Sequence, residues 1–278
     1  MPVANEQAWL DNSTLPISIH DINNLSDQAK RRIYRNLIPP QLLVQFDIDP
    51  ISWQGPTGES HIRLIAEPDS GSLHLGAKHV ADASDEFFTI ELTDNAINGI
   101  DLNLLLLNDP HSPRFKTDYD EDGQPTMLGT ARRNLNEEAR ALQAGLAPAQ
   151  FRSSLRASKL VLQQIENFLA TLSHDSFFLE PLTYVSAWVF EQRGFAYMRG
   201  HKLMDDIQRE FQPGGKLHAA LDGSTPFRQP NQWNSVRGRA WAIHDGILEV
   251  IGASWNELRM IKRVGHDAGV NTFPDAKY

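Results

Sequence analysis

The sequence contains no cysteine. This absence excludes disulfide bonds, thiolate nucleophiles and zinc–thiolate sites, so any metal would need His, Asp or Glu ligands. Long hydrophobic runs are also missing, because the apolar stretch Leu104–Leu107 is far short of the ~20 residues of a membrane span. The first residues, MPVANEQAWLDNST, have neither the basic region nor the apolar core of a signal peptide, so we expect a cytoplasmic protein.

An excess of positive charge is missing too. The chain has 26 basic and 35 acidic side chains, which gives a net charge of −9. Nucleic-acid backbones and anionic membranes attract proteins through clustered Lys and Arg, and the sequence has no run of these residues longer than Lys30–Arg32. We therefore expect a small-molecule ligand, with neither nucleic acid nor membrane as a partner.

Length and composition are those of an ordinary globular protein. The chain has 278 residues, of which 41% are hydrophobic and 22% are charged, so it can bury a sizeable core. No stretch has the composition of a linker between domains. We therefore expect one domain over residues 1–278.

The first half of the sequence predicts mainly strands. Ser26–Leu37 has helical spacing and is followed by Pro39-Pro40, which cannot continue a helix. A strand is expected at Leu42–Ile48. The runs HIRLIAE, SLHLGAKHV, EFFTIEL and IDLNLLLL, separated by Pro, Gly, Asp and Asn, are typical of an antiparallel sheet that meanders.

The second half predicts a helical and mixed region. Expected helices are Asn134–Ala144, Phe151–Leu172, Thr183–Gln192 and Gly200–Phe211; expected strands are Ser176–Glu180, Arg239–Val250 and Leu258–Val264, with a long loop at Gln212–Asn234. The fold class that follows is α+β. We expect an antiparallel, sheet-rich part over about residues 40–110, followed by a helical and mixed part over about residues 130–278.

One segment resembles a known family. The sequences FRSSLRASKLVLQQIENFLATLSHDSFFLEPL (Phe151–Leu182) and SAWVFEQRGFAY (Ser186–Tyr197) resemble the acetyl-CoA-binding half of the GNAT superfamily of N-acetyltransferases, with its long helix, strand, helix and Gly-Phe turn. The resemblance covers residues 151–197. It implies a GNAT-like fold and acetyl-CoA or another acyl-CoA as cofactor, with Arg152 and the N-terminus of the long helix beside the pyrophosphate.

The loop Asp118–Gly129, DYDEDGQPTMLG, begins like a calcium-binding loop. Its twelfth position, where such loops have a bidentate Glu, is Gly129, so a solvated acidic loop is the better interpretation. The ten histidines show no H-E-x-x-H or H-x-H spacing. The sequence therefore predicts no metal ligands.

The densest group of polar residues is Leu221–Gly246. Forked guanidinium groups bind carboxylates and phosphates in pairs, aromatic rings offer stacking faces, and a His beside an Asp forms a titratable pair. We expect a pocket for an anionic ligand here, with Tyr184, Glu191, Tyr197 and His201 as its other wall. The predicted ligand-binding residues of the chain are Arg152, Arg228, Trp233, Arg237, Arg239 and Asp245.

Three functions fit these observations. The first is a small-molecule enzyme acting on an anionic or CoA-linked substrate, specifically an acyl-CoA-dependent N-acyltransferase. In that enzyme Glu191 or His244 would be the general base and Tyr197 the proton donor to the departing thiolate. The alternatives are a metal-dependent enzyme with His and carboxylate ligands, and a non-catalytic protein that binds a small ligand.

Overall fold

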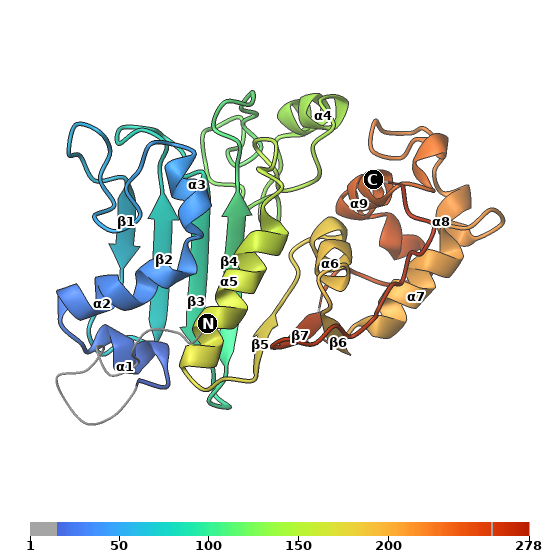
Figure 1. The fold of residues 1–278 in the computed structure, drawn as a ribbon. Helices are drawn as coiled ribbons and strands as arrows, with labels where there is room; N and C mark the ends of the chain where they lie inside the picture. Colours follow the sequence, from blue (N-terminus) through green and yellow to red (C-terminus); the bar gives the residue numbers. More distant parts are fainter. Residues whose placement is uncertain (1–15, 257, 278) are drawn as a thin grey trace. The chain divides into compact units, whose positions relative to one another are not determined.

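The computed structural model describes residues 16–256 and 258–277. These residues form nine α-helices and seven strands, paired mostly antiparallel (Figure 1), which confirms the predicted α+β class. The chain divides into two compact units, each assembled from separate stretches of sequence. The first unit contains residues 16–110, Leu155–Phe178 and Arg263–Gly265; the second contains His111–Ser154, Leu179–Lys262 and residues 266–277. That the whole chain is one domain stays a prediction.

Helices precede the first strand of the first unit. Ser26 begins the helix predicted there, because its hydroxyl accepts a hydrogen bond from the backbone N–H of Ala29. The strand predicted at Leu42–Ile48 is wrong. A helix begins at Pro40, whose fixed φ and missing N–H suit the first position of a helix. The elements are α1 (Ile19–Asn23), α2 (Asp27–Tyr34), the 3₁₀ helix η2 (Arg35–Leu37) and α3 (Pro40–Val44).

The four predicted strands between residues 62 and 107 are confirmed. Neighbouring strands pair antiparallel, and the register sets Leu73 opposite Leu92 and Leu75 opposite Ile90. All four of these side chains are buried, so one face of the sheet belongs to the core. The strands are β1 (Ile62–Ile65), β2 (Ser72–Ala77), β3 (Phe88–Asp94) and β4 (Ile100–Leu107).

The last strand pairing of the first unit is parallel. α5 (Ser158–Thr171) connects β4 to β5 (Ser176–Leu179), and one residue pair, Asp101 with Phe178, joins the two strands. Among the described residues, the later part of β4 pairs only with β3. Beyond Asp101, the edge of β4 on the side of β5 therefore has no strand partner in the described part of the chain, and at its end the Leu107 carbonyl accepts from the backbone N–H of Leu155.

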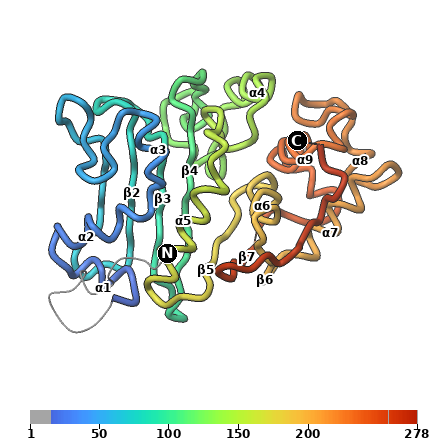
Figure 2. Tube along the Cα trace, in the orientation of Figure 1, coloured from blue at the N-terminus to red at the C-terminus, as the bar shows by residue number. Residues whose placement is uncertain are grey.

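The long helix α5 begins later than predicted. The backbone N–H of Leu155 donates to the carbonyl of Leu107 at 3.1 Å, and Arg156 has a φ of 56°. These contacts hold the preceding segment against the end of β4, so the helix begins at Ser158. Figure 2 traces α5 in yellow-green. The apolar face of α5 is buried, and its Phe168 ring packs on Tyr34 at 6.2 Å between centroids.

Helices dominate the second unit. The predicted helices near residues 134, 184 and 201 and the strand near residue 259 are confirmed, whereas the strand predicted at Arg239–Val250 is wrong. The elements are α4 (Leu135–Gln143), α6 (Tyr184–Glu191), β6 (Ala196–Arg199), α7 (His201–Glu210), α8 (Lys216–Ala219), η3 (Pro230–Gln232), α9 (Val236–His244), η4 (Ile247–Ile251) and β7 (Arg259–Arg263).

α9 was difficult to recognise because it is buried almost all round, so no polar stripe reveals helical spacing. The Ser235 hydroxyl begins it by accepting from the backbone N–H of Gly238 at 3.0 Å. Trp241 of α9 is fully buried, and its indole N–H donates to the carbonyl of Leu146 at 2.8 Å. No helix within residues 16–256 and 258–277 combines the length and apolar character needed to cross a bilayer.

Candidate functional site

Three of the predicted site residues, Arg237, Arg239 and His244, lie on α9. The side chains of Arg237 and Arg239 point in different directions. Residues two positions apart lie on one face of a strand but on nearly opposite sides of a helix. The Arg239 guanidinium donates to Gln208 at 2.6 Å. Arg237 instead approaches Gly145, where an added Cβ would lie 3.3 Å from Nη1 of Arg237. The two arginines therefore occupy different surroundings.

A charged cluster surrounds the end of α9. It consists of Arg133, Glu138, Arg228, His244 and Asp245. Arg133 bridges the two acids: Nε lies 2.9 Å and Nη2 2.5 Å from Oε2 of Glu138, and Nη1 lies 3.0 Å from Oδ1 of Asp245. Both carboxylates are largely buried, with side-chain exposures of 3% for Glu138 and 11% for Asp245. Each arginine here faces a carboxylate, so the charges offset one another.

Within the charged cluster, Glu138 and His244 form a carboxylate–imidazole pair. Oε1 of Glu138 lies 3.2 Å from Nε2 of His244. Burial raises the pKa of Glu138, but His244 and Arg133 outweigh this effect and hold the pKa below its ordinary value. Among the described residues, no hydrogen-bond partner meets Nδ1 of His244. A ring oriented through one nitrogen and open at the other can act as a general base.

The His244 ring packs against Gly129, a position without a side chain. The φ of Gly129 is 83°, and an added Cβ would lie 2.6 Å from Cε1 of the His244 ring. The backbone conformation and the close approach both require glycine. The residue that replaces the calcium ligand in the acidic loop thus makes room for the imidazole.

Arg228 and Asp245, both predicted to bind a ligand, bind each other. Nε of Arg228 donates to Oδ2 of Asp245 at 2.9 Å, and Nη2 donates to the Asp245 carbonyl. Thr225 adds a hydrogen bond to the same carboxylate oxygen at 3.0 Å. With Arg133 on the other oxygen, the Asp245 carboxylate is fully engaged. Ligand binding by this pair stays a prediction.

Arg239 lies in a second, buried group. Its Nε donates to the carbonyl of Trp233 at 2.6 Å, and Nη1 lies 3.4 Å from the Tyr184 hydroxyl. Trp233 supplies only its backbone here, because its ring packs edge-on against His218 at 5.7 Å between centroids. The structure thus brings together Arg239, Trp233 and Tyr184, three residues expected to share a pocket.

Glu191 and Tyr197 also meet. The Tyr197 hydroxyl donates to Oε1 of Glu191 at 2.6 Å, and Thr272 donates its backbone N–H at 2.9 Å and its hydroxyl at 2.7 Å to the same carboxylate. Burial, followed by the Glu191 charge, raises the pKa of Tyr197. A phenol that holds its proton so tightly suits hydrogen bonding better than proton donation to a thiolate. His201 stacks on the Tyr197 ring at 5.4 Å.

Arg152 does not reach the N-terminus of α5. Its Nη1 donates to the carbonyl of Ser112 at 2.5 Å, and the helix begins six residues later at Ser158. The basic residues that flank this helix end are Arg156 and Lys159, both exposed. Sequence reasoning missed them because it placed the helix start too early.

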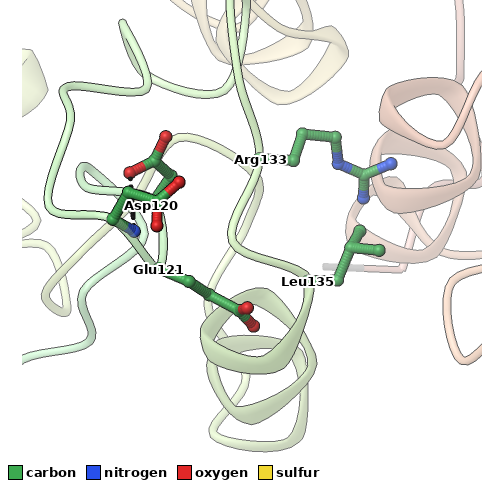
Figure 3. Close-up of a pocket in the computed structure, with 5 residues that line it drawn as sticks. Asp120, Glu121, Arg133 and Leu135 are labelled. Atoms are coloured by element: carbon green, nitrogen blue, oxygen red, sulfur yellow. Dashed lines mark hydrogen bonds between the residues drawn. The ribbon is translucent and has the colours of Figure 1, made fainter.

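The acidic loop borders a small pocket of about 320 Å³, lined by Asp120, Glu121, Asp122, Arg133 and Leu135. Figure 3 shows the Arg133 guanidinium directed away from the carboxylates of Asp120 and Glu121. Asp120 already accepts from Arg132 and from the backbone N–H of Gln124, which lowers its pKa. The described residues contain no group of three or more His, Asp or Glu arranged to hold a metal.

Comparison with known proteins adds no relative: no family model, curated protein or solved structure matches the sequence. The function must therefore be argued from the geometry above.

Proposed function

We propose that the protein is an acyl-CoA-dependent acyltransferase whose cofactor binds the first unit along β4 and the N-terminus of α5. The observation that carries this proposal is the β4–α5–β5 crossover. Its two parallel strands share one residue pair, Asp101 with Phe178. Ligands of α/β sheets bind outside the carboxyl ends of parallel strands where neighbouring strands separate.

The path of the chain agrees with the GNAT resemblance. In that family a strand directly precedes the long helix, whereas here residues 111–154 intervene in the sequence. These residues belong to the second unit, and the hydrogen bond from Leu155 to Leu107 returns the chain to the last residue of β4. Within the first unit, β4 is therefore followed directly by α5.

The start of α5 offers suitable chemistry for a pyrophosphate. Ala157 at the N-cap provides no side-chain acceptor, and the first turn contains no acidic residue. Backbone N–H groups and the positive end of the helix dipole favour an anion there. Exposed Arg156 and Lys159 add positive charge beside the same turn.

The separated edge of β4 suits the rest of the cofactor. An extended chain with amide groups, such as a pantetheine arm, can add to an open strand edge through main-chain hydrogen bonds. Acyl transfer then requires an amine or alcohol to attack the thioester carbonyl, lose a proton to a base and expel the thiolate. Of the two predicted bases, both in the second unit, His244 is the better proton acceptor, because its Nδ1 has no hydrogen-bond partner among the described residues, whereas Glu191 already accepts three hydrogen bonds.

Calorimetric titration with acetyl-CoA tests the proposal. We expect saturable binding, weakened at least tenfold by the double charge reversal Arg156→Glu with Lys159→Glu, since charge-assisted contacts to phosphate are lost. Lys202→Glu is the matched control because Lys202 is also exposed and also occupies the second position of a helix, α7. Absence of binding by the unaltered protein, or an equal loss in the control, would overturn the proposal.

A further inference from the structure

Arg239 is a cation buried without an anion. Its side chain belongs to a residue that is 0% exposed, and its Nη2 is buried with no hydrogen-bond partner. No carboxylate of the described residues forms an ion pair with it. Burial accordingly lowers the pKa of Arg239. An unpaired buried charge is costly, whereas an anion at the open nitrogen would offset that cost.

The groups around Arg239 are all neutral. Besides the Trp233 carbonyl, Gln208 accepts at 2.6 Å, while the rings of Phe211 and Phe273 lie over the guanidinium at 5.1 and 3.5 Å from their centroids. Aromatic faces attract a cation only weakly compared with a carboxylate. This side chain is therefore held in place through two of its nitrogens, and the third is left to bind something else.

The C-terminal tail, residues 271–277, covers this place. Its buried residues are Thr272 and Phe273, and each contacts a buried charged side chain. Thr272 donates two hydrogen bonds to Glu191, and the ring of Phe273 stacks on the Arg239 guanidinium. Further along, the Lys277 carbonyl accepts from the backbone N–H of Val236 at 2.8 Å. The tail is thus fastened by a few contacts on either side of Phe273.

We propose that Nη2 of Arg239 is the binding site for a small carboxylate, and that Thr272 and Phe273 form a strap that must lift to admit it. A carboxylate matches the planar guanidinium and supplies the missing negative charge. A small ligand fits because neutral side chains enclose the rest of the group. The site lies in the second unit and involves none of the residues assigned to bind acyl-CoA; Glu191, which Thr272 contacts, is the one residue that also enters the proposed acyl transfer.

Sodium acetate is the probe, titrated by calorimetry and by melting temperature against sodium chloride of equal ionic strength. We expect saturable acetate binding that raises the melting temperature, because the ligand binds the folded state. Arg239→Met should abolish the effect. Arg209→Met, an exposed arginine on α7, is the control and should respond as the unaltered protein does.

Thr272→Val tests the strap without touching the arginine. It removes one hydrogen bond to Glu191, so the open form becomes more populated and the apparent affinity for acetate should rise severalfold. If Arg239→Met does not fold, Arg239→Lys serves instead, with at least tenfold weaker binding expected because a single ammonium cannot keep the contacts to Trp233 and Gln208 and also bind the anion. Equal acetate responses with and without Arg239, or no acetate binding even in Thr272→Val, would overturn the proposal.

Discussion

The charged cluster and the surroundings of Arg239 lie in the same unit but differ in the partners that they give to an arginine. Arg133 faces two carboxylates, Glu138 and Asp245, and keeps 24% of its side chain exposed. Arg239 is fully buried and faces only neutral groups. Paired charges are costly to break, whereas an unpaired buried charge is costly to keep. The comparison predicts that breaking the charged cluster is costly, whereas removing the charge of Arg239 is not; binding by Arg239 stays our proposal.

The largest expected effect comes from removing the shared anion of the charged cluster. Glu138→Gln removes the carboxylate that Arg133 and His244 share in a largely buried place and leaves Arg133 with Asp245 alone, so it should lower the free energy of unfolding by about 3–5 kcal/mol. Urea unfolding measures it. Glu249→Gln, an exposed site, should change stability by less than about 0.5 kcal/mol. A small effect at Glu138 would contradict the stabilising role of the cluster.

Replacing Arg133 or Arg239 by Met compares the contributions of the two arginines to stability. Arg133→Met removes the cation that Glu138 and Asp245 share, leaves them the contacts of His244 and Arg228, and should cost about 3 kcal/mol. Arg239→Met leaves the acceptors of Trp233 and Gln208 without a donor, but it also removes an unpaired buried charge, so it should cost less than Arg133→Met. Urea unfolding of both variants, without added carboxylate, measures the two free energies of unfolding. If Arg239→Met proves the more damaging of the two, then Arg239 is a structural residue.

Glycine substitutions test how closely the charged cluster is packed. Gly129→Ala adds a methyl group 2.6 Å from the His244 ring at a φ of 83°, so both strain and a clash are expected. Gly123→Ala in the same loop has a similar φ of 75° but nothing within 4 Å. Thermal unfolding should therefore show about 1–2 kcal/mol more destabilisation for Gly129→Ala. Equal losses would mean that His244 moves aside freely.

Acid should weaken the charged cluster in a defined window. The pKa of Glu138 is held below its ordinary value of 4.5 in the folded protein. A carboxylate of this kind stabilises the fold above its unfolded-state pKa, and the contribution is lost as the pH falls through the folded-state pKa. The stability difference between the unaltered protein and Glu138→Gln should therefore shrink below about pH 4.5. A constant difference down to pH 3 would contradict the depressed pKa.

Local patterns predicted much of the fold. Alternating apolar residues marked β1–β4, and Ser26 marked the start of α2, because these signals depend on neighbours in the sequence. The helix α9 was not predicted, because it is buried on almost every side and its sequence therefore has no polar face at helical spacing. The helix α3 was not predicted either, because Pro39-Pro40 was read only as the end of the preceding helix, whereas Pro40 also begins the next one.

The candidate site was predictable only in part. Sequence reasoning chose His244 and Asp245 but missed Glu138 and Arg133, which lie more than 100 positions away in the chain. No local pattern reports a contact over that distance. It also grouped Arg239 with Arg228 and Arg237 because all three lie in the polar segment Leu221–Gly246, whereas α9 directs Arg237 and Arg239 to different surroundings. The isolation of Arg239 depends on Phe211 and Phe273, which surround it only in the folded chain.

The interleaved sequence of the two units has a consequence for synthesis on the ribosome. Strands β1–β4 are complete at Leu107, but α5, whose apolar face is buried in the same unit, follows only after residues 111–154 of the other unit. A nascent chain therefore lacks the cover of α5 while roughly sixty further residues are made, which takes several seconds at typical elongation rates, and only the earlier helices, such as α1 on β2 and β3, are in place. Chaperones have their longest opportunity to bind in that interval, and a chain that stops near residue 110 should aggregate.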